Sequence, residues 1–214
     1  NTNLAGADLT NATLKNTSFA NAYLVHANFT GATQNGFTQS QLREAESVDG
    51  TNFSNNDFSG WDLSSLDLAN TNLENTNLTG ADFSNATLKN TVFVRANLTN
   101  ANLAGTTKNG LAEIQLRTAS SIKGANLSNN DFANWILTEL DFNGAKIENS
   151  TLTGASINKA SLANASLVGT DATNANFANT DFSNANLENT KLNNSDFTNA
   201  TFANTSFANA DTTN

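Results

Sequence analysis

The 214-residue chain has no cysteine, no proline, no methionine and a single histidine, His26. The absence of cysteine excludes a disulfide framework and any metal site built on thiolates. One histidine cannot supply the histidine cluster of a zinc site. No apolar run approaches the ~20 residues of a membrane span, and no basic segment followed by an apolar stretch marks a secretory signal. Few of the groups that catalysis or metal binding usually needs are therefore available.

Basic residues are also scarce, because Lys and Arg total 10 against 19 Asp and Glu, which gives a formal charge of −9. These few scattered cations do not suffice for a nucleic-acid-binding surface. The acidity favours solubility. It also permits a second interpretation, in which an acidic surface imitates the charge of a nucleic acid.

The most regular feature of the chain is a five-residue period. Residues 71–90 read TNLENTNLTGADFSNATLKN, with one large apolar residue in the middle of each group of five. The period holds at 34 central positions, which are Leu, Phe or Ile everywhere except at Ala172. Five matches neither the 3.6-residue period of a helix nor the two-residue period of a strand. The chain must therefore change direction once within every group.

The change of direction is placed two residues after each central position, where the residue is Asn or Gly in 29 of the 34 groups. These residues adopt positive φ at little cost. The exceptions are His26, Ser65, Arg95, Glu139 and Lys159. The residue two before the centre is mostly Ala, Thr or Ser and would point inward beside it. We predict a chain that turns at every corner and buries a core between stacked coils, with three or four sides to a coil.

The pattern resembles the pentapeptide-repeat family, whose motif is A-(D/N)-L-x-x. It is carried by GADLTNATLKN at residues 6–16 and by TNANFANTDFSNANLENTKLNNSDFTNATFANTSFANAD at residues 173–211. The resemblance implies an all-β fold, a right-handed quadrilateral parallel β-helix (β-solenoid) with about 20 residues per coil. We expect residues 1–214 to form a single solenoid of about nine coils.

Two interruptions of the repeat are copies of one another. Residues 35–50 read NGFTQSQLREAESVDG (loop 1) and residues 109–124 read NGLAEIQLRTASSIKG (loop 2), at an offset of 74. If each loop adds 14 residues, the remaining 60 are twelve groups of five, which predicts that both loops leave the same side of the solenoid. Thr38 and Gln41 resemble a capping box, which predicts one or two turns of helix in each loop.

The duplicated loops supply the candidates for recognition of a partner protein. These candidates are Gln41 and Arg43 in loop 1 and Gln115 and Arg117 in loop 2. Trp61 and Trp135 follow the loops at inward positions that are usually small. An indole is too large for a regular coil there, so we expect the coil to widen beneath each loop helix. Duplicated tryptophans favour packing over a ligand platform.

No catalytic, cofactor-binding or metal-binding residue is predicted. Ser and Thr are abundant, but none lies near an obvious base. Asp57, Asp62 and Asp67 fall on consecutive sides of one coil, so they diverge and cannot share a proton or a metal ion. No glycine-rich phosphate-binding motif occurs. We predict a protein that is not an enzyme, needs no cofactor, binds no nucleic acid and does not insert into membranes.

Three functions remain open, of which the first is self-assembly. Solenoids usually need polar caps, and neither end shows one, so the ends around Leu4 and Leu9 and around Phe202 and Phe207 predict head-to-tail stacking into a filament. The absence of an initial Met and of Cys, with abundant Asn and Thr, suggests an extracellular or cell-surface protein, and a periplasmic or cytoplasmic location stays open. The resemblance implies the second function, since some family members imitate DNA and bind DNA gyrase. The third function is a scaffold whose two loops bind one partner protein.

Overall fold

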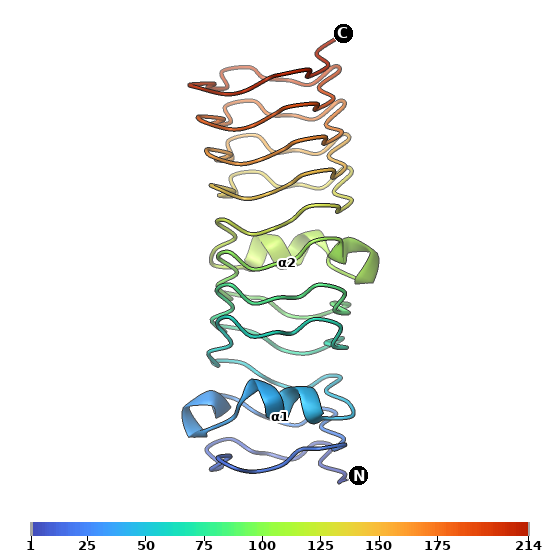
Figure 1. Ribbon diagram of the computed structural model, residues 1–214, viewed down its shortest axis with the longest axis vertical. Coiled ribbons are helices and arrows are strands. Elements are labelled where there is room, and N and C mark those ends of the chain that lie inside the picture. Colours follow the sequence, from blue (N-terminus) through green and yellow to red (C-terminus); the bar gives the residue numbers. More distant parts are fainter. Residues whose placement is uncertain (1, 214) are drawn as a thin grey trace. The chain divides into compact units, whose positions relative to one another are not determined.

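The computed structural model describes residues 2–213, which contain four short helical elements (Figure 1). These are η1 (Ala32–Asn35), α1 (Gln39–Glu44), η2 (Thr106–Asn109) and α2 (Glu113–Thr118). Within residues 2–213 the repeats pair only through single parallel β-bridges, and no longer strand occurs. A group of five that includes a turn leaves too few extended residues for a longer ladder. Each predicted extended side is therefore shorter than a regular strand.

The described residues divide into two compact units. Residues 2–98 and Asn109–Ser121 form the first unit, and Thr99–Lys108 and residues 122–213 form the second. Both α1 and α2 belong to the first unit. Each unit repeats the same construction.

The register of the bridges shows the number of sides to a coil. In the first unit Asp57 pairs with Asn77, and in the second Asp141 pairs with Ser161, so that each partner lies four groups of five further along the chain. Four groups per coil select the four-sided coil over the three-sided one. Between neighbouring coils the N–H of Phe58 donates to Asn77 O at 2.8 Å, and the N–H of Asn77 donates to Asn56 O at 3.0 Å.

The core of each unit is built from the central residues and the small residues two before them. Phe53 and Phe83 in the first unit and Phe177 and Phe182 in the second are fully buried. Neighbouring rings meet edge to face, with centroids 5.2 Å apart for Phe177 and Phe182. Buried alanines such as Ala81 fill the space beside them. The predicted inward placement of one large and one small residue per side is confirmed.

The predicted corners are also confirmed. Every residue that lies two after a central position has positive φ. The five exceptions to the Asn or Gly rule adopt the same conformation, with φ of 57° at His26 and 65° at Glu139. The ladder therefore imposes the corner, and the choice of residue only decides how much strain the corner carries.

The loops add four residues to a coil, not the 14 that the sequence suggested. Bridges that span them join residues 24 apart, as in Tyr23 with Ser47 and Asn97 with Ser121. The repeat resumes one group earlier than Phe53 and Leu127, at the buried Val48 and Ile122. Each helical segment itself supplies one side of its coil.

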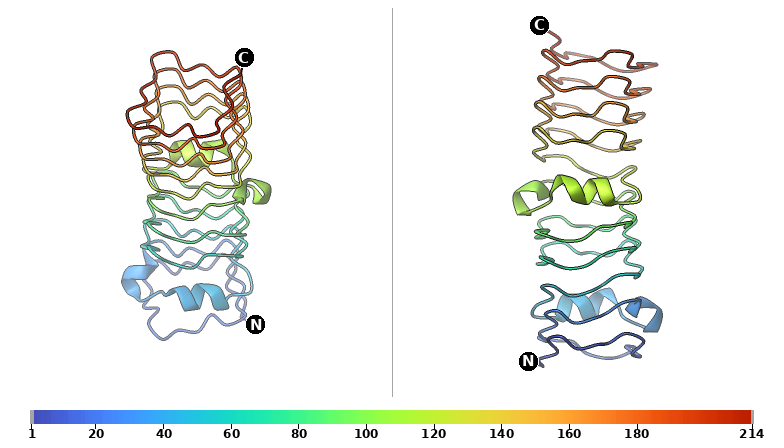
Figure 2. Two further views of the ribbon diagram at one scale, coloured as in Figure 1. Left: turned by 45° about the horizontal axis from the view of Figure 1, so that its top comes forward. Right: turned by 180° about the vertical axis from the view of Figure 1, so that it is seen from behind.

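The prediction that both loops leave the same side is consequently wrong. With four added residues per loop, the offset of 74 leaves fourteen groups of five, which is three and a half coils. Helix α1 contacts Asp62, whose ladder continues to Asp82, whereas α2 contacts Thr91, next to Val92. Since Asp82 and Val92 lie two sides apart, the helices occupy opposite sides of the first unit. Figure 1 has α1 toward the viewer, and the view from behind in Figure 2 brings α2 forward.

The corner conformation can be tested at Asn85, where φ is 59° and the side chain is exposed. We expect Asn85→Val to lower the free energy of unfolding by about 1–2 kcal/mol, because a β-branched residue is strained in the left-handed region. Asn85→Gly is the matched control and should be close to neutral, since glycine accepts this φ freely. Urea unfolding followed by circular dichroism measures both. Equal stability of the two variants would contradict the corner assignment.

Candidate functional site

Helix α1 is fixed to the preceding coil by the side chain of Gln41, which is only 7% exposed. Its Nε2 donates to Leu14 O at 2.7 Å and to Thr17 O at 2.6 Å. Its Oε1 accepts from Thr38 N at 2.7 Å, while Thr38 Oγ1 accepts from Gln41 N at 3.4 Å, so the two residues form a capping box. One amide thus satisfies two carbonyls of the coil and caps the helix.

Helix α2 repeats this attachment through Gln115, which is 4% exposed. Its Nε2 donates to Leu88 O and Thr91 O, both at 2.8 Å, and its Oε1 accepts from Ala112 N at 2.5 Å. Alanine replaces Thr38 here, so the hydroxyl half of the cap is missing and the glutamine half remains. The amide of the glutamine is the constant part of both loops.

The prediction of Gln41 and Gln115 as recognition residues therefore needs correction. Both side chains are buried, and both ends of each amide are occupied by hydrogen bonds within the chain. They position the helices and present nothing to a partner. The sequence signal was their duplication, which marks a shared role without telling recognition from attachment.

A second pair of anchors, Asn56 and Asn130, was not predicted. Asn56, 3% exposed, donates to Phe29 O at 2.9 Å and to Phe53 O at 2.8 Å, and its Oδ1 accepts from Thr33 N in η1. In the second unit, Asn130 makes the equivalent bonds to Leu103 O and Leu127 O and accepts from Thr107 N. The signal that could have found them is an Asn at an inward position usually held by Ala, Thr or Ser, at both copies of NLSNNDF or NFSNNDF.

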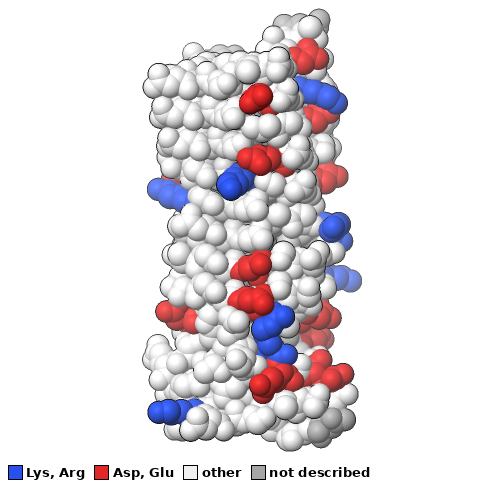
Figure 3. Space-filling model, viewed as in Figure 1, with Lys and Arg blue, Asp and Glu red and all other residues white. Residues whose placement is uncertain are grey.

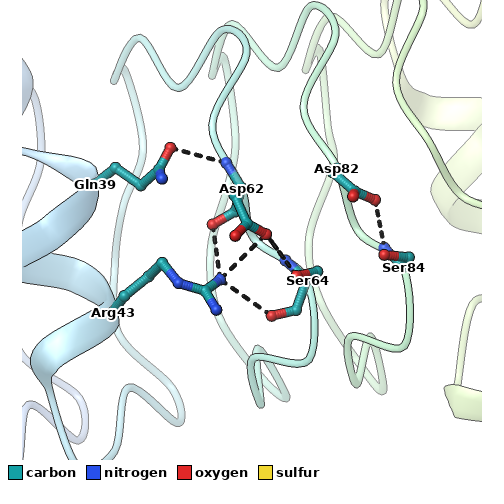
Figure 4. Close-up of polar contacts among 6 residues, drawn as sticks. All are labelled: Gln39, Arg43, Asp62, Ser64, Asp82 and Ser84. Atoms are coloured by element: carbon teal, nitrogen blue, oxygen red, sulfur yellow. Dashed lines mark hydrogen bonds and ion pairs between the residues drawn. The ribbon is translucent and has the colours of Figure 1, made fainter.

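Arg43 lies at the C-terminal end of α1 and reaches the following coil (Figure 4). Its guanidinium donates to Asp62 O at 3.0 Å and Ser64 O at 3.1 Å, and it lies 3.2 Å from the Asp62 carboxylate. Gln39, one turn earlier, accepts from Asp62 N at 2.8 Å. Figure 4 shows both side chains pointing from α1 toward Asp62. Arg43 is thus an exposed contact between the loop and its own unit, with 35% of its side chain accessible.

Arg117 differs from its counterpart in loop 1. It forms an ion pair within α2, at 3.0 Å from Glu113, and its side chain is 45% exposed. The position equivalent to Asp62 is Ile136, so the carboxylate that Arg43 uses has no equivalent in the sequence. Of the four predicted recognition residues, the two arginines keep exposed side chains, with Arg43 at 35% and Arg117 at 45%, whereas the two glutamines are buried.

The tryptophans lie beside the phenylalanines that follow the loops. Trp61 stacks on Phe58 with ring centroids 4.2 Å apart and an interplanar angle of 20°, and it also approaches Phe37. In the second unit Trp135 meets Phe132 edge to face at 4.9 Å. Both indoles are half-buried. A shallow hollow of about 470 Å³ lies beside Trp61, lined also by Gln39 and Asp57.

The aspartates that precede central residues share one local arrangement. In each, one carboxylate oxygen accepts from the N–H two residues later, as in Asp62 with Ser64 N at 3.0 Å and Asp181 with Ser183 N at 2.9 Å. The hydrogen bond from the hydroxyl of Ser64 or Ser183 and then the N–H bond hold the pKa of Asp62 and Asp181 below the ordinary value. The carboxylates therefore stay ionised while they cap the turns.

Charged side chains on the surface are sparse and mixed in sign, as the face in Figure 3 shows. Within residues 2–213 no group of three or more His, Asp or Glu residues could hold a metal ion. None of the helices in that part of the chain is long and apolar enough to cross a membrane. The candidate sites that remain for binding another molecule are the two helices α1 and α2 and the end faces, which are the surfaces around Leu4 and Leu9 and around Phe202 and Phe207.

The predicted end residues lie in two different environments. Leu4 and Leu9 are half-buried in the first unit. Phe202 and Phe207 in the second unit are 36% and 38% exposed, far more than the fully buried Phe182 and Leu187 at the equivalent positions one coil earlier. They line a hollow of about 300 Å³ together with Leu192 and Phe197.

Comparison with known families agrees with this construction. The family model for pentapeptide repeats (8 copies) matches residues 1–33, 76–107 and 120–154, and the model for a pentapeptide repeat region matches residues 148–214. Together these ranges cover well over half of the chain. The chain belongs to the pentapeptide-repeat family. No curated protein matches it.

Solved structures of other pentapeptide-repeat proteins are similar to this family member. Rfr23 from the cyanobacterium Cyanothece 51142 is 24% identical over 44% of this chain and 65% of its own, with a TM-score of 0.42. The match thus spans less than two thirds of Rfr23. HetL, involved in heterocyst differentiation regulation in Nostoc sp. strain PCC 7120, is 24% identical over 98% of this chain and 88% of its own, with a TM-score of 0.48. A trypsin-treated variant of QnrB1, a plasmid-mediated fluoroquinolone resistance protein, is 22% identical over 78% and 85%, with a TM-score of 0.38. Likeness at this level carries no argument about function.

The attachment of α2 predicts that Gln115→Leu destabilises the protein. The change leaves the carbonyl of Thr91 without its donor and removes one of the two donors to Leu88 O, which still accepts from Thr91 N, and we expect it to lower the free energy of unfolding by about 1–3 kcal/mol. Arg117→Leu on the same helix is the control and should change stability by less than about 0.5 kcal/mol. Urea unfolding followed by tryptophan fluorescence compares them. An equal loss in both variants would show that the glutamine is not the anchor.

The lowered pKa values predict a loss of stability in acid. Because the folded-state pKa of Asp181 and Asp196 lies below the ordinary value, their stabilisation is present at neutral pH and is lost as the pH falls through the folded-state pKa. We expect the Tm to fall as the pH drops below about 4. The double variant Asp181→Asn, Asp196→Asn keeps the acceptor oxygens without the titration, so its Tm should fall less steeply. Identical slopes for the two proteins, measured by calorimetry, would contradict this origin.

Proposed function

We propose that this 214-residue chain is a non-enzymatic structural scaffold, a quadrilateral β-solenoid of about nine coils, which stacks end to end with other copies of itself into a filament. The observation that carries the proposal is the exposed apolar face around Phe202 and Phe207. Removing such rings from water contributes roughly 1.5–3 kcal/mol each. A further coil of the same construction is the surface best shaped to cover them.

The backbone groups on this face support stacking. Within residues 2–213 the N–H groups of Phe197, Phe202 and Phe207 donate to no backbone carbonyl, whereas the N–H of the equivalent Phe177 donates to Asp196 O at 2.7 Å. A row of unpaired backbone groups is a template for pairing with another chain.

The first coil carries the complementary groups. In the interior, the residue before each centre turns both its N–H and its C=O to the preceding coil, as Asn28 does toward Ala7 and Leu9. At Asn3 and Asp8 no such backbone bonds are found among the described residues. The unpaired backbone groups of the first coil therefore differ from those of the last coil, and the two sets are complementary in a head-to-tail arrangement. Such a heterologous contact does not close, so it extends into a filament.

The parallel rings of successive coils also favour the addition of a further coil at this face. Phe182 and Phe202 stack with centroids 5.4 Å apart and planes 13° apart, and Phe177 and Phe197 stack at 5.3 Å and 10°. A coil placed on Phe202 and Phe197 would continue these columns. In line with the composition, we propose an extracellular or cell-surface setting for such a filament.

Imitation of DNA is the second candidate, favoured by the net charge of −9. A gyrase-type topoisomerase would be the partner. The ladders of the second unit argue against it, because the column through Asp131, Thr151, Asp171 and Lys191 alternates acid with other residues. Lys191 also lies 3.3 Å from Asp171 and neutralises it. A scaffold that offers both loops to one partner is weakened in turn, since α1 and α2 face opposite sides of the first unit.

Assembly is tested by negative-stain electron microscopy and light scattering of the untagged chain over a range of concentrations. We expect filaments whose length grows with concentration, and we expect Phe207→Lys to shorten them to single chains, because it places a charge on the stacking face. Tyr23→Lys is the control, since Tyr23 is 42% exposed but belongs to the first unit, whereas Phe207 belongs to the second. Single chains at every concentration, or normal filaments from Phe207→Lys, would overturn the proposal.

A further inference from the structure

A groove of about 280 Å³ runs between α2 and the coil before it, within the first unit. Its walls include Val92, Val94, Ala112 and Ile114. Val92 and Ile114 are 37% and 60% exposed, which is unusual for aliphatic side chains in a chain whose surface is mostly Asn, Thr, Ser and Asp. The lining of this groove is thus apolar and open to solvent.

Loop 1 provides an internal comparison, because the duplication repeats the same position. The hollow beside α1 includes Ser18 and Thr38, where loop 2 has Val92 and Ala112. Ser40 of α1 likewise corresponds to Ile114 of α2. The glutamine anchor is the same in both loops, so the attachment of the helix does not require an aliphatic lining. The apolar character belongs to loop 2 alone.

The groove of loop 2 also differs from the hollow of loop 1 in its charged residues. Lys15 and Glu44 both border the hollow in loop 1. In loop 2 the lysine is kept as Lys89, whereas the acid is replaced by Thr118. Lys89 has no ion-pair partner anywhere in residues 2–213. An apolar groove with one uncompensated cation at its border is complementary to an anion with an apolar body.

The dimensions favour a small molecule over a passing peptide. A volume of about 280 Å³ lies near the lower limit of small-ligand sites, which is about 300 Å³. One part of the groove is closed, because Gly110 packs against the backbone of Lys89 so tightly that an added Cβ would lie 2.7 Å from Lys89 N. A bound peptide that extended along the groove past Gly110 would collide with the backbone of Lys89.

We propose that the groove beneath α2 binds a small amphipathic anion, with its apolar body against Val92 and Ile114 and its acid group beside Lys89. An aromatic acid of one or two rings or a medium-chain fatty acid has this chemistry. The site is formed by other residues than the end faces, so it does not depend on filament assembly.

The probe for this site is 8-anilinonaphthalene-1-sulfonate, which joins an apolar ring system to an anionic group. We expect saturable fluorescence enhancement with the wild-type chain and displacement of the probe by octanoate. The double variant Val92→Ser, Ile114→Ser gives loop 2 the residues that loop 1 already carries, so the fold should be preserved, as circular dichroism would verify. We expect its Kd for the probe to rise by roughly tenfold or more.

Two further variants separate the parts of the proposal. Lys89→Gln should weaken binding severalfold and reduce its dependence on salt, whereas Lys15→Gln, its loop 1 counterpart, should change neither. Phe207→Lys should leave the affinity unchanged, which distinguishes this groove from the hollow at the end face.

Undiminished binding by the serine double variant would overturn the site, and undiminished binding by Lys89→Gln would overturn its preference for an anion. Displacement of the probe by an uncharged apolar peptide but not by octanoate would assign the groove to a protein partner, and the proposal would again fail.

Discussion

The positive-φ corner repeated every five residues is the constraint on which the rest of this protein depends. It holds the chain to four sides per coil, brings equivalent positions of successive coils into register, and forces each central residue inward. His26, Arg95, Glu139 and Lys159 adopt the corner although their side chains disfavour it, with φ between 57° and 65°. Strain of about 1–2 kcal/mol at such a position is tolerated because each corner is bound on both sides by hydrogen-bonded ladders. The fold is therefore determined collectively, and no single corner residue decides it.

Interruption of this ladder is costly, and buried amides reduce that cost in both loops. A helix that replaces one side of a coil leaves carbonyls of the preceding coil without their usual donors. Gln41 and Gln115 supply the donors to Thr17 O and Thr91 O, and Asn56 and Asn130 add a second donor to Phe29 O and Leu103 O where the 3₁₀ segments begin. Each amide has a donor and an acceptor end, so it satisfies the coil and the inserted segment at once. The need to hydrogen-bond these backbone groups explains why the same amide residues occur in both copies of the loop.

The five-residue pattern was sufficient to predict the core and the corners, because Leu, Phe, Asn and Gly report directly on burial and on φ. It failed at the loops. Val48 with Gly50 and Ile122 with Gly124 continue the repeat, but both pairs fall inside the segments 35–50 and 109–124, so the predicted insertions are too long and the predicted sides are wrong. The sequence predicts Gln41 and Gln115 as recognition residues, because it shows that a polar residue is repeated but not whether the fold places backbone carbonyls within reach of that residue. The Arg43–Asp62 pair could not be predicted either, because it joins α1 to the following coil, and the register between them depends on how many residues the loop adds.

The two loops show which parts of a duplicated element are structural and which are free to change. The glutamine anchor and the lysine at the groove remain the same, whereas the exposed residues of the helix differ. Loop 1 binds the following coil through Gln39 and Arg43, which both contact Asp62. Loop 2 has Ile136 at the position of Asp62, keeps its arginine within α2 and exposes Val92 and Ile114. A structural requirement alone would have retained the self-contacts of loop 1 in both places. The divergence at loop 2 is therefore most simply explained by a ligand, and it involves none of the residues through which the end faces would assemble.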